Sequence, residues 1–126
     1  MIERIKQVSR LDQVIVATTT NTTYDPIAEL VESIGGADYY RGSEHDVLKR
    51  VDGYQQSNNI DVCVDITGDC PLTDPQIINE VLQAYDNAQP DAVYVGNIDG
   101  VSVVPAGFDV QAFSAAALRN TSPSTQ

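Results

Sequence analysis

Basic side chains are scarce in this sequence. Its 126 residues include seven Lys and Arg against 18 Asp and Glu, which gives a formal net charge of −11 at pH 7. The seven basic residues are spread along the chain: Arg4, Lys6, Arg10, Arg41, Lys49, Arg50 and Arg119. Binding to nucleic acid or to an anionic membrane surface requires basic residues clustered on one face, where they meet several phosphates at once. We therefore expect neither nucleic acid nor a membrane as a partner.

Long apolar runs and export signals are also missing. No stretch approaches the roughly 18 consecutive apolar residues that a membrane-spanning helix needs. The first ten residues, MIERIKQVSR, mix charged and apolar side chains and lack the apolar centre of a secretory signal. We expect a cytoplasmic protein.

Residues with metal-binding or redox chemistry are few. The sequence has two cysteines, Cys63 and Cys70, and one histidine, His45. These residues do not form a metal-binding spacing, and disulfides are rare in proteins without export features. We expect both thiols to be free and buried. We expect His45, in the first turn of a predicted helix, to be solvated and without a functional role.

A glycine-rich turn for a dinucleotide is absent as well. No Gly-x-Gly-x-x-Gly segment follows any predicted strand, which argues against a dinucleotide-binding domain. The sequence also lacks internal repeats and low-complexity segments. With 126 residues, 42% of them hydrophobic, the chain fits a single domain over residues 1–120. The polar tail at 121–126 is expected to fray.

Predicted strands and helices alternate along the chain. Short apolar runs predict five strands, at residues 13–17, 37–40, 61–66, 91–95 and 108–113. Helices are predicted after the first three strands, and a last helix begins at 115–119. This alternation is typical of an α/β fold with a parallel sheet and right-handed crossovers.

The predicted helices have recognisable starts and apolar faces. Asp25-Pro26 and Asp74-Pro75 each offer an N-cap followed by a proline at the first helical position. Ser43, with Asp46 three residues later, resembles a capping box. Apolar residues at helical spacing predict one buried face in each helix: Ile27, Leu30, Val31 and Ile34; Val47, Leu48, Val51 and Tyr54; and Ile77, Ile78, Val81, Leu82 and Tyr85.

The segment DITGDC, residues 65–70, places a carboxylate directly after a predicted buried strand. Ligands of open α/β sheets bind beyond the carboxyl ends of strands, and Asp69 falls at such an end. Gly68 lets the backbone approach a ligand closely, and Pro71 stiffens the exit of the turn. Mg²⁺ is commonly held by one or two carboxylates together with substrate phosphates. Alternatively, Asp69 only caps its own turn by accepting backbone N–H groups.

Three segments together resemble a known family. RGSEHDVLKR (41–50), DITGDCPLTDPQIINEVL (65–82) and PAGFDVQAFSAAAL (105–118), in this order, resemble the cytidylyltransferases, which include spore coat polysaccharide biosynthesis protein F and relatives of the acylneuraminate and 3-deoxy-manno-octulosonate enzymes. The resemblance extends from Met1 to about Leu118. It implies an α/β, three-layer Rossmann-like nucleotide-diphospho-sugar transferase fold with a mostly parallel sheet. It also implies transfer of CMP from CTP to an acidic sugar, with release of pyrophosphate.

The resemblance also implies a cation site. The aspartate of the Gly-Asp-x-Pro-Leu motif is Asp69, a ligand for Mg²⁺, and Gly68 lies beside it at the nucleotide. Asp109 is a second candidate, either as a metal ligand or as a contact to the sugar. Gln111 stands where many relatives have Glu, and Asp65 where many have Arg, so the detailed chemistry of this chain is not fixed by the resemblance.

The Arg-Gly-Ser segment is the other part of the implied site. By resemblance, Arg41, Gly42 and Ser43 lie beside the nucleotide or the sugar. Two alternatives stay open, since Arg41 could be a surface arginine and Ser43 could serve as the N-cap of the following helix. The hydroxyl of a capping serine keeps some bonding capacity, so Ser43 could do both.

Family members begin with a further strand and a basic loop around the triphosphate, and they continue beyond the last helix expected here. We therefore expect a domain that is truncated at both ends. A triphosphate brings nearly four negative charges, and few cations here could meet them. We expect weak CTP binding and little or no turnover by the chain alone. The alternative is a non-catalytic relative that acts as a binding or assembly module.

The missing strand has a structural consequence. It lies in the middle of the family's sheet, so its neighbours, at residues 13–17 and 61–66, must pair directly or leave apolar edges unpaired. An unpaired edge recruits another chain. We expect a homodimer or a swapped oligomer.

Overall fold

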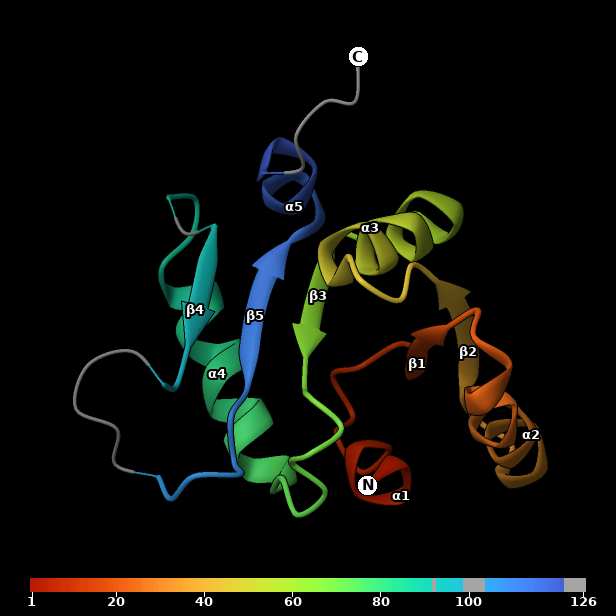
Figure 1. Ribbon diagram of the computed structural model, residues 1–126. Helices are drawn as coiled ribbons and strands as arrows, with labels where there is room; N and C mark the ends of the chain where they lie inside the picture. Colours follow the sequence, from red (N-terminus) through yellow and green to blue (C-terminus); the bar gives the residue numbers. More distant parts are fainter. Residues whose placement is uncertain (92, 99–103, 122–126) are drawn as a thin grey trace. The chain divides into compact units, whose positions relative to one another are not determined.

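The computed structural model describes residues 1–91, 93–98 and 104–121, which fall into two units (Figure 1). Of the described residues, the first unit takes those of Met1–Leu11 and Asp61–Ala117, and the second takes Asp12–Ile60 and Leu118–Thr121. One domain over residues 1–120 stays a prediction, and the predicted tail falls almost entirely outside the described residues. Within the described ranges, no helix is both long and apolar enough to cross a membrane.

The first unit is built on a three-stranded sheet. Its strands are β3 (Val62–Asp65), β5 (Gln111–Ser114) and β4 (Tyr94–Gly96), in that order across the sheet (Figure 1). The central strand β5 is antiparallel to both neighbours, so β3 and β4 run in the same direction. The sequence predicts the alternating elements but not this reversal. An antiparallel neighbour needs no helical crossover, and none was predicted between the fourth and fifth strands.

Helix α4 (Pro75–Asn87) covers this sheet by packing on β4 and β5. The carboxylate of Asp74 accepts the Gln76 N–H at 2.8 Å, and Pro75 occupies the first turn, as the sequence predicts. The predicted apolar face is confirmed, because four of its five residues are buried: Ile78, Val81, Leu82 and Tyr85. The helix is thus fixed at its start by local chemistry and along its length by burial.

The two ends of the first unit's sequence add short helices. Helix α1 (Ile2–Ile5) buries Ile5, and its Arg4 side chain donates to the carbonyl oxygens of Thr73 at 3.2 Å and Leu72 at 3.3 Å. These bonds tie the amino-terminal segment to the turn before α4. Helix α5 (Ala115–Thr121) directly follows β5, as predicted for the last helix.

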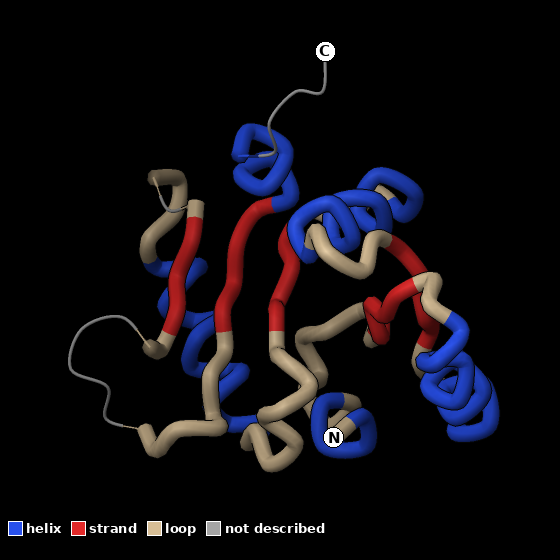
Figure 2. Tube along the Cα trace, viewed as in Figure 1, coloured by secondary structure: helices blue, strands red, loops and turns tan. Residues whose placement is uncertain are grey.

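The second unit contains a parallel strand pair with two helices. Strands β1 (Ile15–Thr19) and β2 (Asp38–Gly42) are in register from Ile15–Asp38 to Thr19–Gly42. A short 3-10 helix η1 (Thr22–Tyr24) and α2 (Asp25–Ile34) connect them, and α3 (Val47–Asn58) follows (Figure 2). Both α-helices pack on the strand pair. The predicted strands at 13–17 and 37–40 are displaced by about two residues, since threonines continue β1 as readily as apolar residues do.

The apolar face predicted for α2 is only partly buried. Ala28 and Val31 are buried, whereas Ile27, Leu30 and Ile34 are 37%, 57% and 40% exposed. Two strands form a narrow surface that covers a strip of the helix rather than the whole apolar stripe. The same holds for α3, where Tyr54 is buried but the predicted core residues Val47 and Leu48 are exposed.

The predicted start of α3 is wrong by one turn. Asp46, not Ser43, is the N-cap, and its carboxylate accepts the Lys49 N–H at 2.9 Å. The Ser43 hydroxyl instead accepts the Asp46 N–H at 3.1 Å, in the turn before the helix. A carboxylate cap is additionally favoured by the positive end of the helix dipole, which explains the later start.

Each unit has its own sheet among the residues with a described position: β1 pairs with β2 in the second unit, and β3 and β4 pair with β5 in the first. Because β1 and β3 belong to different units, the predicted direct pairing of these two strands, or its alternative of unpaired apolar edges, stays a prediction.

Candidate functional site

Three segments of the first unit leave its sheet at the same end. Asp65 at the end of β3 and Gly96 at the end of β4 both pair with Gln111, the first residue of β5. The turn after β3, the residue after β4 and the segment before β5 therefore meet at this end. We call its polar residues the sheet-end cluster: Thr67, Asp69, Asn97 and Asp109.

Asp69 lies on the exposed turn after β3. Its Oδ1 accepts the Thr67 hydroxyl and the Cys70 thiol, the latter at 3.7 Å. The Thr67 hydroxyl, followed by the Asp69 backbone N–H, holds the pKa of this carboxyl below its usual value. Asp69 is thus ionised at neutral pH and remains accessible, even though part of its bonding capacity caps its own turn.

Gly68 has no evident structural requirement. A Cβ at this position would meet no atom within 4 Å, and its φ is not in the left-handed region. A glycine that neither the backbone conformation nor the packing demands leaves the main chain open beside Asp69. This fits the predicted close approach of a ligand.

The two cysteines are free, as predicted. Cys70 is 2% exposed, whereas Cys63 is only half-buried. The Cys70 sulfur lies 3.5 Å from the Thr67 hydroxyl oxygen, so the thiol belongs to the packing of the turn. The expected burial is thus confirmed for Cys70 and partly for Cys63.

Asn97 was not among the predicted site residues. It follows β4 and is half-buried, and its Nδ2 donates to the Phe108 carbonyl at 2.8 Å. Its Oδ1 accepts the Val110 N–H at 2.9 Å, and its own N–H donates to the Val110 carbonyl at 3.2 Å. These bonds bracket Asp109, which is itself half-buried. An asparagine two residues after the strand predicted at 91–95 was the available signal, but its partners could not be read from the sequence.

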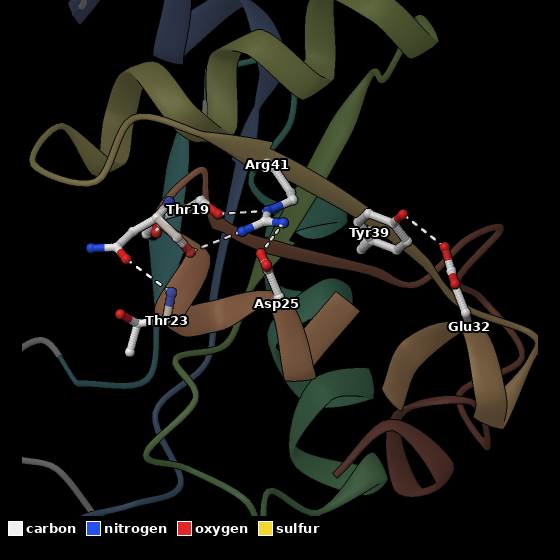
Figure 3. Close-up of polar contacts among 7 residues, drawn as sticks. Thr19, Thr23, Asp25, Glu32, Tyr39 and Arg41 are labelled. Carbon is white, nitrogen blue, oxygen red and sulfur yellow. Dashed lines mark hydrogen bonds and ion pairs between the residues drawn. The ribbon is translucent and has the colours of Figure 1, made fainter. Parts of the chain in front are cut away.

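Arg41 lies at the end of β2, and each nitrogen of its guanidinium group has a partner (Figure 3). Its Nε donates to the Thr19 carbonyl at 2.8 Å, and its Nη2 donates to the Asn21 carbonyl at 2.9 Å. Its Nη1 lies 2.6 Å from Asp25 Oδ1. Arg41 therefore fixes the segment between β1 and α2, which is more than the solvated surface arginine of the alternative interpretation.

The same segment is tied further by carboxylates. Asn21 Nδ2 lies 3.1 and 3.2 Å from the two carboxylate oxygens of Glu44, and Asn21 Oδ1 accepts the Thr23 N–H at 2.9 Å. A further polar contact joins β2 to α2: the Tyr39 hydroxyl donates to Glu32 at 2.8 Å, and this bond raises the pKa of Tyr39 (Figure 3). The polar side chains of Asn21, Tyr39 and Arg41 thus bond to other groups of the second unit.

Gly42 and Ser43 also have structural roles. A Cβ on Gly42 would lie 2.8 Å from the Tyr40 ring and 3.2 Å from Arg50 Cα, so only glycine fits between strand and helix. Arg50 Nη1 donates to the Ser43 carbonyl at 2.7 Å. The Arg-Gly-Ser segment is therefore held by its own fold. His45 is exposed, as expected, but it precedes α3 instead of lying in its first turn.

The first unit also has an apolar hollow of about 210 Å³ between α4 and β4. Its lining is mostly aliphatic, and its polar residues are Glu80 and Asn97. An apolar hollow is poorly suited to a triphosphate, which calls for cations and N–H donors.

The described residues offer few side-chain ligands for a cation. Within the described parts of the chain, no group of three or more His, Cys, Asp or Glu residues could hold a metal ion. Mg²⁺ does not require such a group, because it keeps several waters and uses substrate phosphates as ligands. Asp69, and Asp109 at the same end of the sheet, supply the hard oxygen donors that this ion prefers.

Comparison with known proteins identifies the family. The sequence profile of the cytidylyltransferases matches residues 1–118. The chain belongs to the cytidylyltransferase family. A solved cytidylyltransferase structure from Leptospira borgpetersenii has a similar fold, with a TM-score of 0.86 and 28% sequence identity over 95% of this chain. The predicted α/β fold class is thereby confirmed, with a parallel strand pair in the second unit.

Curated relatives of this family member match over most of the chain. An uncharacterized protein of Methanocaldococcus jannaschii is 39% identical over 98 residues, or 78% of this chain. The 3-deoxy-manno-octulosonate cytidylyltransferase of Zea mays is 36% identical over 73% of the chain. Spore coat polysaccharide biosynthesis protein SpsF of Bacillus subtilis is 31% identical over 68%.

The chain corresponds to only part of these relatives. It spans 40%, 30% and 35% of the three curated proteins and 50% of the Leptospira chain. The family is therefore shown for this chain, whereas the activity and substrates of the longer relatives are questions for experiment.

Proposed function

We propose that this chain forms the part of a cytidylyltransferase that binds the nucleotide and a cation, in an enzyme that transfers CMP from CTP to an acidic sugar. The observation that carries the proposal is the exposed, ionised carboxylate of Asp69 on an open Gly-Asp turn. Family membership and the names of two relatives, both connected with sugar or polysaccharide synthesis, support the substrate class.

The proposed reaction is an in-line displacement at phosphorus. The sugar hydroxyl attacks the α-phosphorus of CTP, a new P–O bond forms, the bond to the β-phosphate oxygen breaks, and pyrophosphate leaves. Mg²⁺, when bound, would neutralise charge on the triphosphate. Asp69 would hold this ion, and Asp109 would contribute a second oxygen donor. The open backbone at Gly68 would let the phosphates approach.

In this proposal, the Arg-Gly-Ser segment lies beside the nucleotide or sugar and shapes the site. Arg41 holds the backbone from Thr19 to Asp25 in place and does not offer a free cation. Gly42 and Ser43 keep the end of β2 close to α3. The segment thus keeps the backbone rigid at the carboxyl ends of β1 and β2.

Electrostatics favour weak binding by the chain alone. A triphosphate approaches a protein of net charge −11, and Arg41 is already engaged. We propose that CTP affinity and turnover are low unless further cations are supplied by another polypeptide segment. The second candidate function, a non-catalytic binding or assembly module, is favoured by this shortage of free cations.

The sheet of the second unit has only two strands, β1 and β2, among the described residues, and this supports the proposal of a homodimer or swapped oligomer. An exposed strand edge offers unpaired N–H and C=O groups to another chain. Analytical ultracentrifugation at high protein concentration tests this. Sedimentation as a monomer over the whole concentration range would contradict the assembly.

The experiment that tests the proposed function is an NMR titration of the ¹⁵N-labelled chain with Mg²⁺ and CTP. We expect weak, saturable shifts at residues 67–70, which the Asp69→Asn substitution abolishes. Asp61→Asn, an exposed carboxylate before the other end of β3, is the matched control and should leave the shifts unchanged. Micromolar affinity would contradict the predicted weak binding, and no shift in the native chain would contradict the proposed nucleotide site.

A further inference from the structure

We infer that Asn97 is a positioning residue that holds Asp109 in place as a cation ligand. The inference rests on the proposed function, because it assumes that the sheet-end cluster binds a divalent cation. It assigns a role to a residue that makes no contact with the metal and acts through its neighbour.

The bonds of Asn97 lie on both sides of Asp109. The Phe108 carbonyl, which accepts Nδ2 at 2.8 Å, belongs to the peptide group before Asp109. The Val110 N–H, which donates to Oδ1 at 2.9 Å, belongs to the peptide group after it. One side-chain amide therefore fixes the two peptide planes that define φ and ψ of Asp109.

Asn97 is itself anchored to the sheet. It follows Gly96, which pairs with Gln111, and its N–H donates to the Val110 carbonyl at 3.2 Å. Val110 is fully buried at 0% exposure. The amide thus connects the end of β4 to a segment whose next residue is locked in the core, and Asp109 cannot turn without breaking one of these bonds.

The chemistry of the side chain fits this task. Bonding to the Phe108 carbonyl and to the Val110 N–H requires one donor and one acceptor at the end of a short side chain, and an amide supplies both. Aspartate lacks the donor, and leucine of similar size lacks both groups. Partners that orient metal ligands through hydrogen bonds are a general feature of metal sites, and their loss commonly weakens metal affinity.

A double-mutant cycle with Mn²⁺ alone as the probe tests the inference. Paramagnetic broadening of amide signals at residues 67–70 and 108–111 of the ¹⁵N-labelled chain reports the affinity even when binding is weak. We expect Asn97→Ala to reduce Mn²⁺ affinity about tenfold. In the Asp109→Asn background, the same substitution should change the affinity less than about twofold, because Asn97 acts only through Asp109.

The controls separate positioning from general stability. Asn87→Ala removes an exposed amide near the end of α4 that bonds Gln83, and it should leave Mn²⁺ affinity unchanged. Circular dichroism checks that each variant is folded. If the alanine variant does not fold, Asn97→Ser, which can keep at most one of the two bonds, gives the same readout with an intermediate loss.

The outcomes distinguish the two proposals. An equal loss of affinity from Asn97→Ala in both backgrounds, or no loss in either, overturns the role of Asn97. If that occurs while Asp69→Asn still abolishes Mn²⁺ binding, the proposed cation site stands without it. If the native chain shows no Mn²⁺-induced broadening at either segment, the cation site and the role of Asn97 both fail.

Discussion

The turn after β3 and the end of β2 each place a charged residue near the carboxyl end of a strand, but these two residues have different partners. Asp69 is exposed, and its hydrogen bonds within the described residues are to groups of its own turn. Arg41, at the end of β2, uses its guanidinium on two carbonyls and the Asp25 carboxylate. The position at a strand end is therefore common to both, whereas free bonding capacity separates a candidate ligand-binding residue from a structural one.

The largest expected effect follows from removing Arg41. Arg41→Ala removes the ion-pair partner of the Asp25 carboxylate and the donor to two carbonyls, so we expect the free energy of unfolding to fall by about 2 kcal/mol. Urea unfolding followed by circular dichroism measures this. Lys49→Ala, which removes an exposed cation early in α3, is the control and should change stability by less than about 0.5 kcal/mol. Equal effects of the two substitutions would show that Arg41 is an ordinary surface residue.

Gly53→Ala tests how closely the second unit is packed. A Cβ at Gly53 would clash with the Tyr40 hydroxyl, and the Tyr40 ring also packs edge-on against Tyr54 at 5.9 Å between centroids. Alanine favours a helix by about 1 kcal/mol over glycine, but overpacking costs about 1–3 kcal/mol. We expect a net loss of about 1 kcal/mol in the free energy of unfolding. A gain in stability would mean that the Tyr40 ring moves freely.

Asp69→Asn tests whether Asp69, unlike Arg41, contributes little to stability. Because Asp69 is exposed and bonds only within its own turn, we expect the free energy of unfolding to change by less than about 0.5 kcal/mol. The same substitution should remove the Mg²⁺-dependent shifts at residues 67–70. Asp25→Asn is the counterpart in the second unit, where the ion pair with Arg41 would be lost and stability should fall further. A large destabilisation by Asp69→Asn would support the alternative that Asp69 only caps its turn.

The features that the sequence predicts correctly depend on local chemistry. Asp74 and Pro75 start α4 as expected, because capping involves only neighbouring residues. The same prediction is wrong for Asp25, which is the first residue of α2 instead of its N-cap, and whose carboxylate pairs with Arg41. The exposed faces were mispredicted, because the spacing of Leu30 and Val31 shows an apolar stripe but not the width of the strand pair beneath it. The reversed direction of β5 likewise depends on pairing across the sheet.

In the candidate site, too, the features that depend on neighbouring residues were predictable and the contacts between distant segments were not. Asp69 could be predicted, because a Gly-Asp pair directly after an apolar run is a local pattern. The engagement of Arg41 could not, since its partners Thr19 and Asp25 belong to segments distant in the sequence. The bonds from Asn97 to the peptide groups on both sides of Asp109 are also contacts across the sheet. Local patterns in a single sequence do not predict which segments become neighbours.

The smallest expected effect concerns the ionisation of Asp69. Thr67→Val removes the hydroxyl that contributes most to lowering the pKa of Asp69, so we expect this pKa to rise toward its ordinary value. A carboxyl whose pKa is lower in the folded state stabilises the fold above its unfolded-state pKa, and this contribution is lost as the pH falls through the folded-state pKa. The variant should therefore lose the contribution at a higher pH than the native chain. A ¹³C NMR titration of the Asp69 carboxyl measures the shift, with Thr23→Val as a control in the second unit. An unchanged titration curve in Thr67→Val would mean that the lowered pKa of Asp69 does not depend on the Thr67 hydroxyl and comes from the other donors of the turn, the Asp69 N–H and the Cys70 thiol.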